Sequence, residues 1–300
     1  MTNKNSLVAF IDILGFRNHI DNYYSGKDTK FLQVLKTAMK DAETFAIDYS
    51  KNYLKQFKIK FTFRQFSDCI CITMPLKQKL SHTNLTLLGS FVNVVRTYQL
   101  ILLVNEIYVR GGVSIGGHFE NSNMIFSEGI VKAYKLESQK AIYPRIILDE
   151  ELLKLLQQIS KENSEDFETF SKIYGQSLIK DWDEEVFISP FGMIQELKET
   201  LNQLDEENRK HFLESYLNVN SINSSSADEI IEDLNKSDYE LQFIQETTNK
   251  VNQFLLDKVN EKPEVILKYK WMKQFLVWNL NPENSQIKFE HYFKSDPTRA

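Results

Sequence analysis

The order of strand-like and helix-like segments between residues 7 and 117 places the tightest limit on the fold of this chain. Apolar runs and strict apolar–polar alternation predict strands, whereas apolar residues at helical spacing predict helices. These signals predict, in chain order, a strand over 7–13, a helix over 28–55, a strand pair over 57–75 with a turn at Ser67–Asp68, a helix over 84–104 and a strand over 107–117. The order β-α-β-β-α-β is the split βαβ arrangement, a ferredoxin-like fold of the α+β class whose antiparallel sheet carries both helices on one face.

Two acids occupy related places in this order. Asp12 ends the first predicted strand, and Asp68 lies at the hairpin between the second and third. The first and third strands are central neighbours in this topology, so the two carboxylates can converge. An unpaired buried charge is costly, so Asp12 needs a partner, which could be a Lys or Arg, a run of backbone N–H groups or a metal ion. Because the two acids can converge, we expect this partner to be a divalent cation shared with Asp68. Taken singly, Asp12 could cap the following turn and Asp68 could be an ordinary hairpin residue.

Composition narrows the class of protein. The 300 residues carry 42% hydrophobic and 26% charged residues, as is typical of globular proteins. A net charge of −5 argues against a partner that is nucleic acid. The sequence contains no apolar run that we expect to cross a bilayer and no leader, so we expect a cytoplasmic protein without stable membrane association.

The sulfur and imidazole side chains give little support for zinc chemistry. Cys69 and Cys71 lie two apart on one predicted strand, so their side chains should point the same way as free, buried thiols. The five histidines show no spacing typical of metal ligands.

The second half of the chain has a different composition. Residues 151–300 read as a mostly helical, acidic extension packed on a core formed by residues 1–150. Within it, 181–191 predicts a short strand and turn that could add to the edge of the sheet, and 218–229 is a low-complexity loop. Helices are expected over about 228–260 and 264–280.

Aromatic residues and one arginine in these later segments are expected to be structural. Trp271 and Trp278 stand at helical spacing, which indicates packing rather than a binding site. Arg145, after Tyr143–Pro144, is expected to hold a turn.

Four segments resemble the motifs of class III nucleotidyl cyclases. "FIDILGF" is similar to their first strand, "RQFSDCICI" to their metal-binding hairpin, "VRGGVSIGG" to the following glycine-bearing strand and "EGIVKAYKLESQKA" to the helix that carries their transition-state residues. The segments occur in the family's order and cover roughly residues 7–150. The likeness is closest to the pyrimidine cyclases of the Pycsar antiphage systems, on "RGG" at 110–112, "AIYPRI" at 141–146 and "LKYKWMKQFLVWNL" near the C-terminus.

The resemblance implies a palm-type core that uses two divalent cations, Mg²⁺ or Mn²⁺. It places both ions on Asp12 and Asp68, with the backbone carbonyl of Ile13 completing a metal shell. Residues 14–18, including Gly15 and Phe16, would offer backbone N–H groups to the β- and γ-phosphates if they open a helix.

The chain departs from the family at the residues that select the base and stabilise the transition state. Where cyclases carry a base-selecting residue, this chain has Arg64, which donates hydrogen bonds only and suits the carbonyl-bearing edge of cytosine or uracil. The family's Asn and Arg positions fall on Val131 and Lys135, or, with a one-residue gap, the Asn position falls on Lys132. Lys132 and Lys135 are candidates to neutralise phosphate charge, and Arg110 either binds phosphate or pairs with an acid.

The resemblance therefore predicts a homodimeric cyclase that converts UTP or CTP to the 3′,5′-cyclic monophosphate and pyrophosphate. The product would be a second messenger in antiphage defence, read by a separate effector without direct contact. A purine cyclase or a palm-type nucleotidyltransferase is the first alternative. The second is a homodimeric interaction protein with a degenerate site, which the missing Asn and Arg favour.

Overall fold

The computed structural model describes residues 4–76, 82–121, 123–162, 170–171, 174–175, 177–192, 201, 205–207, 209, 232, 239–258 and 261–292. The strands are β1 (Lys4–Ile13), β2 (Thr62–Phe66), β3 (Cys69–Pro75), β4 (Val109–Glu120), β5 (Ile125–Ser127), β6 (Ile146–Leu148), β7 (Leu178–Lys180), β8 (Val186–Ile188) and β9 (Glu290–His291). The α-helices are α1 (Phe16–Tyr24), α2 (Phe31–Tyr53), α3 (His82–Val104), α4 (Glu128–Gln139), α5 (Glu150–Glu162), α10 (Tyr239–Asp257) and α11 (Pro263–Leu280). Two short 3-10 helices cover Lys55–Phe57 and Pro282–Asn284.

The predicted α+β class and the split βαβ core are confirmed. The sheet runs in the order β2-β3-β1-β4-β6-β8-β7-β9, so the first and third strands of the core are neighbours at its centre. Strands β1, β3 and β4 pair antiparallel, with Asp12 opposite Cys69 on one side and opposite Arg110 on the other. This register brings the end of β1 next to the β2–β3 turn, as the sequence predicts.

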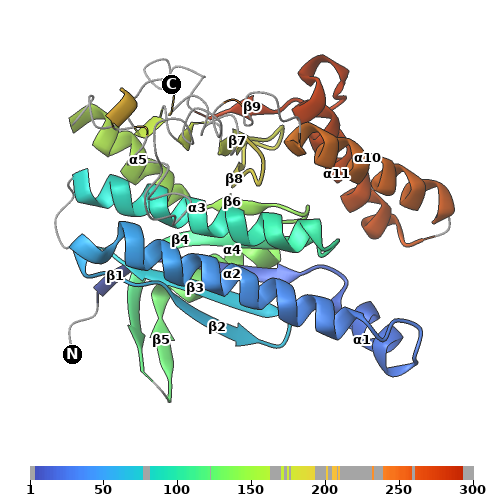
Figure 1. Ribbon diagram of the computed structural model, residues 1–300, viewed down its shortest axis with the longest axis horizontal. Coiled ribbons are helices and arrows are strands. Elements are labelled where there is room, and N and C mark those ends of the chain that lie inside the picture. The colour runs from blue at the N-terminus through green and yellow to red at the C-terminus, as the bar shows by residue number, and fades with distance from the viewer. Residues whose placement is uncertain are drawn as a thin grey trace.

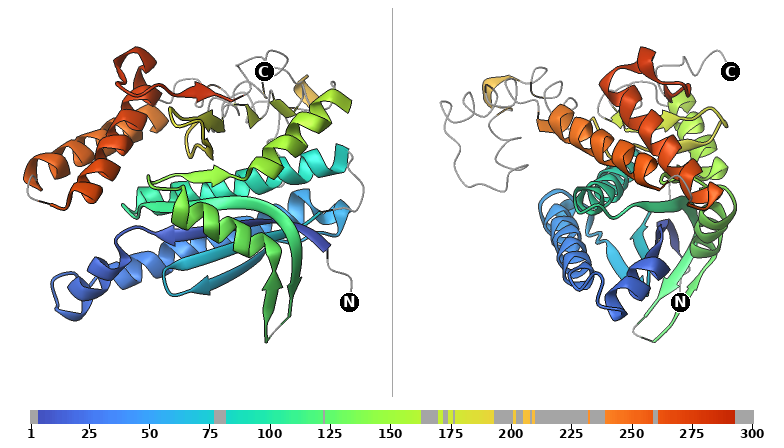
Figure 2. Two further views of the ribbon diagram at one scale, coloured as in Figure 1. Left: turned by 180° about the vertical axis from the view of Figure 1, so that it is seen from behind. Right: turned by 90° about the vertical axis from the view of Figure 1, so that its right-hand side faces the viewer.

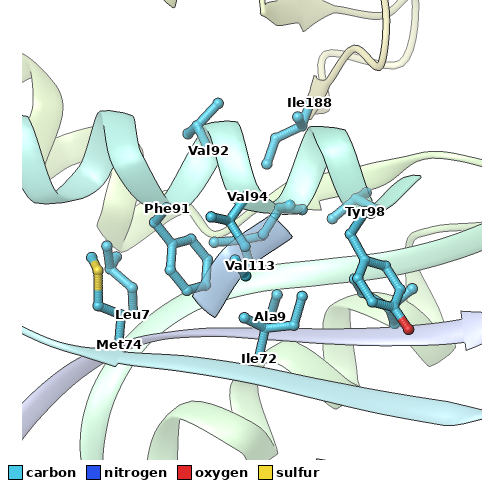
Figure 3. Packing of buried hydrophobic residues seen from close by; sticks show 14 of the residues in the cluster. Leu7, Ala9, Ile72, Met74, Phe91, Val92, Val94, Tyr98, Val113 and Ile188 are labelled. Atoms are coloured by element: carbon cyan, nitrogen blue, oxygen red, sulfur yellow. The ribbon is translucent and has the colours of Figure 1, made fainter. Parts of the chain in front are cut away.

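Helices α2 and α3 cover one face of the sheet (Figure 1), as predicted. Alternate residues of β1, including Leu7 and Ala9, point into this layer, where α3 places Phe91 and Tyr98 above them (Figure 3). The intervening residues of β1, among them Val8 and Asp12, face the opposite side. Helix α4 covers that side (Figure 2, left), so the acid end of β1 lies beneath α4 rather than in the main core.

Glycines allow α4 to lie directly on β4. A Cβ atom on Gly112 would lie 2.5 Å from the carbonyl oxygen of Ala133 and 2.5 Å from Cβ of Leu136, and one on Gly116 would lie 2.7 Å from the amide nitrogen of Gly129. No side chain fits between these backbones. Gly112 and Gly116 of "VRGGVSIGG" are therefore required by helix-on-strand packing.

Several sequence-based boundaries shift. The helix predicted over 28–55 begins at Phe31, and the strand predicted from residue 57 begins at Thr62, although Ile59 and Phe61 before it are buried. The helix predicted over 228–260 is described from Tyr239, and the predicted loop 218–229 lies outside the described residues.

The expectation that no apolar run is long enough to cross a bilayer is wrong. Residues 85–104 of α3 form a helix of sufficient length and hydropathy, and 72% of that window is buried inside the structure. A core helix meets this test because most of its surface is buried against its neighbours, and Figure 3 shows Phe91 and Tyr98 of α3 above the strands.

The second half of the chain extends the sheet instead of only adding helices. At the end of the first 150 residues β6 pairs parallel with β4, and β8 of the second half joins β6 as an added strand, as the segment 181–191 predicts. A second apolar cluster joins α10 and α11 to this extension and contains Trp271 and Trp278 as packing residues. The side chain of Arg145 is fully buried in ion pairs with Asp181 and Asp183, so its predicted structural role is confirmed.

Replacing Gly112 with alanine tests the contact between α4 and β4. Because the added methyl group meets a backbone oxygen and a Cβ atom, Gly112→Ala should lower the free energy of unfolding by about 1–3 kcal/mol. Chemical denaturation followed by circular dichroism measures the change. Gln139→Ala, at an exposed position of α4, is the control and should change stability little. A Gly112→Ala protein as stable as wild type would contradict the packing account.

Candidate metal centre

Asp12 and Asp68 lie close together at one end of the central strands. The structure places one ligand atom from each of Asp12, Asp68 and Cys69 within 4.8 Å of one another. The backbone of the turn is fixed to β1, because the amide N–H of Ile13 donates to the carbonyl oxygen of Asp68 at 3.2 Å. Ser67 makes this tight turn possible by adopting a left-handed conformation, with φ of 58°. The predicted convergence of the two acids is thus seen in the structure.

Arg110 is the basic side chain closest to this pair among the described residues. Its Nε donates to Oδ2 of Asp12 at 3.1 Å, and its terminal nitrogen lies 2.7 Å from Oε1 of Glu137. The second contact is an ion pair without hydrogen-bond alignment, since that oxygen of Glu137 accepts no hydrogen bond. Of the two roles left open for Arg110, pairing with an acid is the one the structure displays.

The carboxylates are crowded and poorly hydrated. Burial raises the pKa of Asp12 above its ordinary value, Arg110 opposes this rise, and the charge of Asp68 adds to it. Burial likewise raises the pKa of Glu137, with Arg110 opposing and Asp12 and Asp68 adding. One guanidinium therefore does not offset three neighbouring carboxylates, and this site favours additional positive charge.

The donor set fits hard divalent cations. Carboxylate oxygens are the ligands that Mg²⁺ and Mn²⁺ prefer. Burial and the nearby acids raise the pKa of Cys69 to about 12, so its thiol stays protonated and is not an anionic ligand. Asp12 and Asp68 would hold the ions, with the carbonyl of Ile13 as the predicted backbone ligand.

Glu137 was not identified from the sequence, although a signal for it exists. Gly129, Ala133 and Glu137 are the buried residues of α4 and recur every four positions, so they share the helix face that meets the sheet. An acid at such a position needs a cation opposite, and Arg110 supplies it.

The other predicted cations lie elsewhere. Arg64 faces the α4 side of the sheet and pairs with Glu120, whose carboxylate also accepts from Thr62 at 3.3 Å. Lys132 forms ion pairs with Glu128 at 3.0 Å and Glu151 at 2.7 Å. Lys135 is exposed on α4. The structure does not bring these three cations to the acid pair, and their roles stay predictions.

The segment after Asp12 opens a helix, as predicted. Gly15 has a φ of 74°, and α1 begins at Phe16. The backbone N–H groups of Gly15, Phe16 and Arg17 have no acceptor within the part of the chain that the structure describes. Unpaired amides at a helix start favour anions.

A large hollow lies on the α4 side of the sheet, with a volume of about 860 Å³. Arg64 and the first turn of α4 line it, together with the loop before β5. Its apolar lining includes four side chains that are 51–69% exposed: Phe66, Met124, Phe126 and Val131. An exposed apolar patch of this kind is typical of an interaction surface.

No protein-family profile matches the sequence, and no curated protein matches it significantly. The chain is similar in structure to the guanylate cyclase domain of RhGC from Catenaria anguillulae in complex with GTP, with 11% identity, a TM-score of 0.37 and coverage of 62% of this chain and 97% of that one. It is similar to the guanylyl cyclase Cya2, with 13% identity, a TM-score of 0.32 and coverage of 51% and 78%. It is also similar to a bacterial light-regulated adenylyl cyclase, with 11% identity, a TM-score of 0.35 and coverage of 64% and 55%. TM-scores of this size assign no activity to the chain, so the case for its function rests on its own residues.

The electrostatics of Asp12 give a test that needs no substrate. Because its pKa is raised above 3.8 in the fold, ionising it penalises only the folded state. The penalty is absent below pH 3.8, grows as the pH rises through the raised pKa and is complete above it. In the absence of divalent cations, Asp12→Asn should therefore be more stable than wild type at pH 7, and the difference should shrink as the pH falls.

Added Mn²⁺ should reverse this order. A cation that binds only the folded state raises the melting temperature of wild type, and the Asp12→Asn protein should lose most of this rise. Differential scanning fluorimetry measures both effects. Asp41→Asn, at an exposed position of α2, should respond to Mn²⁺ like wild type. An equal response of Asp12→Asn would remove Asp12 from the metal centre.

Proposed function

We propose that this protein is a metal-dependent cyclase that converts a pyrimidine nucleoside triphosphate, UTP or CTP, to its 3′,5′-cyclic monophosphate and pyrophosphate. The observation that carries the proposal is the convergence of Asp12 and Asp68 from neighbouring strands of a split βαβ core. Their excess negative charge, which Arg110 alone does not offset, supports binding of divalent cations there. The motif resemblance supplies the reaction class.

The reaction joins the ribose 3′-oxygen to the α-phosphorus and breaks the bond from that phosphorus to the bridging oxygen of pyrophosphate, and the 3′-hydroxyl proton passes to solvent. Bound divalent cations supply the acidity of the 3′-hydroxyl and neutralise the departing pyrophosphate. Asp12 and Asp68 hold these charges in place, and the amides of Gly15 and Phe16 face the phosphates at the start of α1. Arg110, held by Glu137, offers a guanidinium beside the same centre.

Arg64 supports a pyrimidine substrate. A guanidinium donates to the O2 and N3 of cytosine or to a carbonyl of uracil, and it accepts nothing in return. The carboxylate of Glu120 holds Arg64 at the hollow, where Arg64 still lines open space. This arrangement fits both cytosine and uracil, so the identity of the cyclic nucleotide product decides between CTP and UTP as the substrate.

A homodimer completes the proposed site. The exposed apolar side chains around the hollow are suited to burial against a second copy. The hollow of one protomer would then hold the base of a nucleotide whose phosphates bind the acids of the partner. In the cell, the cyclic nucleotide would act as a diffusible signal in antiphage defence, made in the cytoplasm and read by a separate effector.

A substrate panel tests the reaction. The purified protein is incubated with Mn²⁺ and ATP, GTP, CTP or UTP separately, and products are identified by mass spectrometry. We expect cyclic UMP or cyclic CMP, reduced by roughly a thousand-fold or more in Asp12→Ala and Asp68→Ala because each removes charge that stabilises phosphoryl transfer. Asp41→Ala is the matched control.

The other outcomes of the panel are equally informative. A cyclic purine would keep the reaction and discard the role of Arg64. Linear oligonucleotides would indicate a nucleotidyltransferase. Absence of any product would favour the non-catalytic interaction protein, which the engagement of Lys132 with Glu128 and Glu151 supports.

Mixing two inactive variants tests whether the site is shared between protomers. Asp12→Ala and Arg64→Ala should each be inactive alone. In a mixed dimer one of the two sites keeps both residues, so an equal mixture should recover roughly a quarter of wild-type turnover. Turnover is measured after the variants are mixed and allowed to exchange subunits. If the mixture stays inactive although mass spectrometry detects mixed dimers, the acids and Arg64 do not act across protomers.

A further inference from the structure

The C-terminal helix α11 packs beside the segment that follows Asp12 of the candidate metal centre. Tyr269 of α11 packs edge-on against Tyr108, with ring centroids 5.5 Å apart. The backbone carbonyl oxygen of Tyr108 accepts a hydrogen bond from the backbone N–H of Leu14 at 2.9 Å, and Leu14 lies two residues after Asp12. The helix is therefore fixed beside the segment that carries the acid.

A second anchor holds α11 two residues further along, at Trp271. Nε1 of Trp271 donates to the buried carboxylate of Asp181 at 2.8 Å, and its ring stacks on Tyr143 with centroids 5.5 Å apart. Arg145 pairs with the same Asp181. Because these groups are buried, α11 has little freedom to move relative to the sheet.

Between α11 and the start of α1 lies a cavity of about 310 Å³. Its walls come from Leu14 and Gly15, from the polar side chains of α1 and from the hairpin formed by α10 and α11. Figure 1 shows α1 and the α10–α11 pair at the same end of the molecule. Since Leu14 and Gly15 directly follow Asp12 and Ile13, the cavity adjoins the acid pair.

Lys268 lines this cavity and is half-buried. It has no ion-pair partner within 4 Å among the residues that the structure describes. It shares the cavity with Leu14 and Gly15, and the charges of Arg110, Asp12, Glu264 and Glu137 all act on it. Burial is the main factor that lowers its pKa, followed by the charge of Arg110, so an added anion would favour its protonated form.

The remaining charges of the lining leave Lys268 available. Glu106 forms an ion pair with Lys250 at 2.6 Å. Lys258 adds a second cation, Glu261 is the other acid of the lining, and Asn18 and Asn22 offer amide donors. The wall thus combines Lys258 and Lys268, which have no ion-pair partner within the described part of the chain, with two acids and neutral amide donors.

We propose that Lys268 binds the β- and γ-phosphates of the substrate, so that α11 supplies the cationic wall of the active site from outside the split βαβ core. This inference rests on the proposed cyclase function for the identity of the substrate. The basic and amide groups of the cavity wall, beside acids that suit divalent cations, fit a metal-bound polyphosphate. The alternative is that Lys268 is a fixed counter-ion that only offsets the charge of Asp12 and Glu137.

Inorganic tripolyphosphate in the presence of Mg²⁺ distinguishes these roles without requiring turnover. Isothermal titration calorimetry compares wild type, Lys268→Gln and Lys270→Gln, the last an exposed lysine of the same helix that does not line the cavity. Loss of a charge-assisted contact should weaken binding by roughly ten-fold or more in Lys268→Gln, with little change in Lys270→Gln. Lys268→Arg should keep most of the affinity.

Two results would overturn the proposal: no binding of tripolyphosphate to wild type, or equal binding by wild type and a folded Lys268→Gln. Equal binding together with altered thermal stability would identify Lys268 as a counter-ion. Cyclic product is measured in parallel, so the two proposals fail separately. If Lys268→Gln binds tripolyphosphate more weakly but wild type makes no cyclic product, Lys268 is a phosphate ligand and the cyclase function is rejected. If wild type makes a cyclic product but Lys268→Gln binds tripolyphosphate as wild type does, the cyclase function stands and the role of Lys268 is rejected.

Discussion

The half-buried carboxylate at the end of the central strand is the constraint on which the rest of the site depends. Asp12 lies between two paired strands and beneath a helix, where water reaches it poorly and its ionised form is disfavoured. Arg110 compensates part of that cost, yet the same guanidinium also serves Glu137. The remaining negative charge is built into the fold, because the register of β1 and β4 fixes Asp12 opposite Arg110. A cation at this place relieves the same imbalance that the fold creates.

Local sequence signals were sufficient for the acids and insufficient for their surroundings. Asp12 and Asp68 follow from the order of elements, since the topology alone makes the first and third strands neighbours. Glu137 could be identified only from the four-residue spacing of Gly129, Ala133 and Glu137 in α4. That spacing has a meaning only when α4 is known to pack on the glycines of β4. Lys268 could not be found in this way. Its proximity to Asp12 arises from side-chain packing between Tyr108 and Tyr269, which are far apart in the chain.

The extension of the sheet was missed for a different reason. Strands β6, β7 and β8 are three residues long, which is too short for alternation to be recognised, and only β8 was expected from its apolar run. The parallel pairing of β6 with β4 depends on the chain returning past α4. Such pairings are set by the tertiary structure. Arg145, in contrast, was correctly expected to be structural, since Asp181 and Asp183 occupy its guanidinium.

The buried ion pairs of Arg145 decide how this protein can be divided. The guanidinium belongs to the first 150 residues, while both of its carboxylate partners and the indole that shares Asp181 come from the later part of the chain. A chain cut at that point would leave a fully buried cation with no counter-charge, and the exposed edge of β6 would lack its neighbour β8. The βαβ core is therefore not a transferable module in this protein. Any grafting, truncation or domain exchange has to carry the C-terminal helices with it.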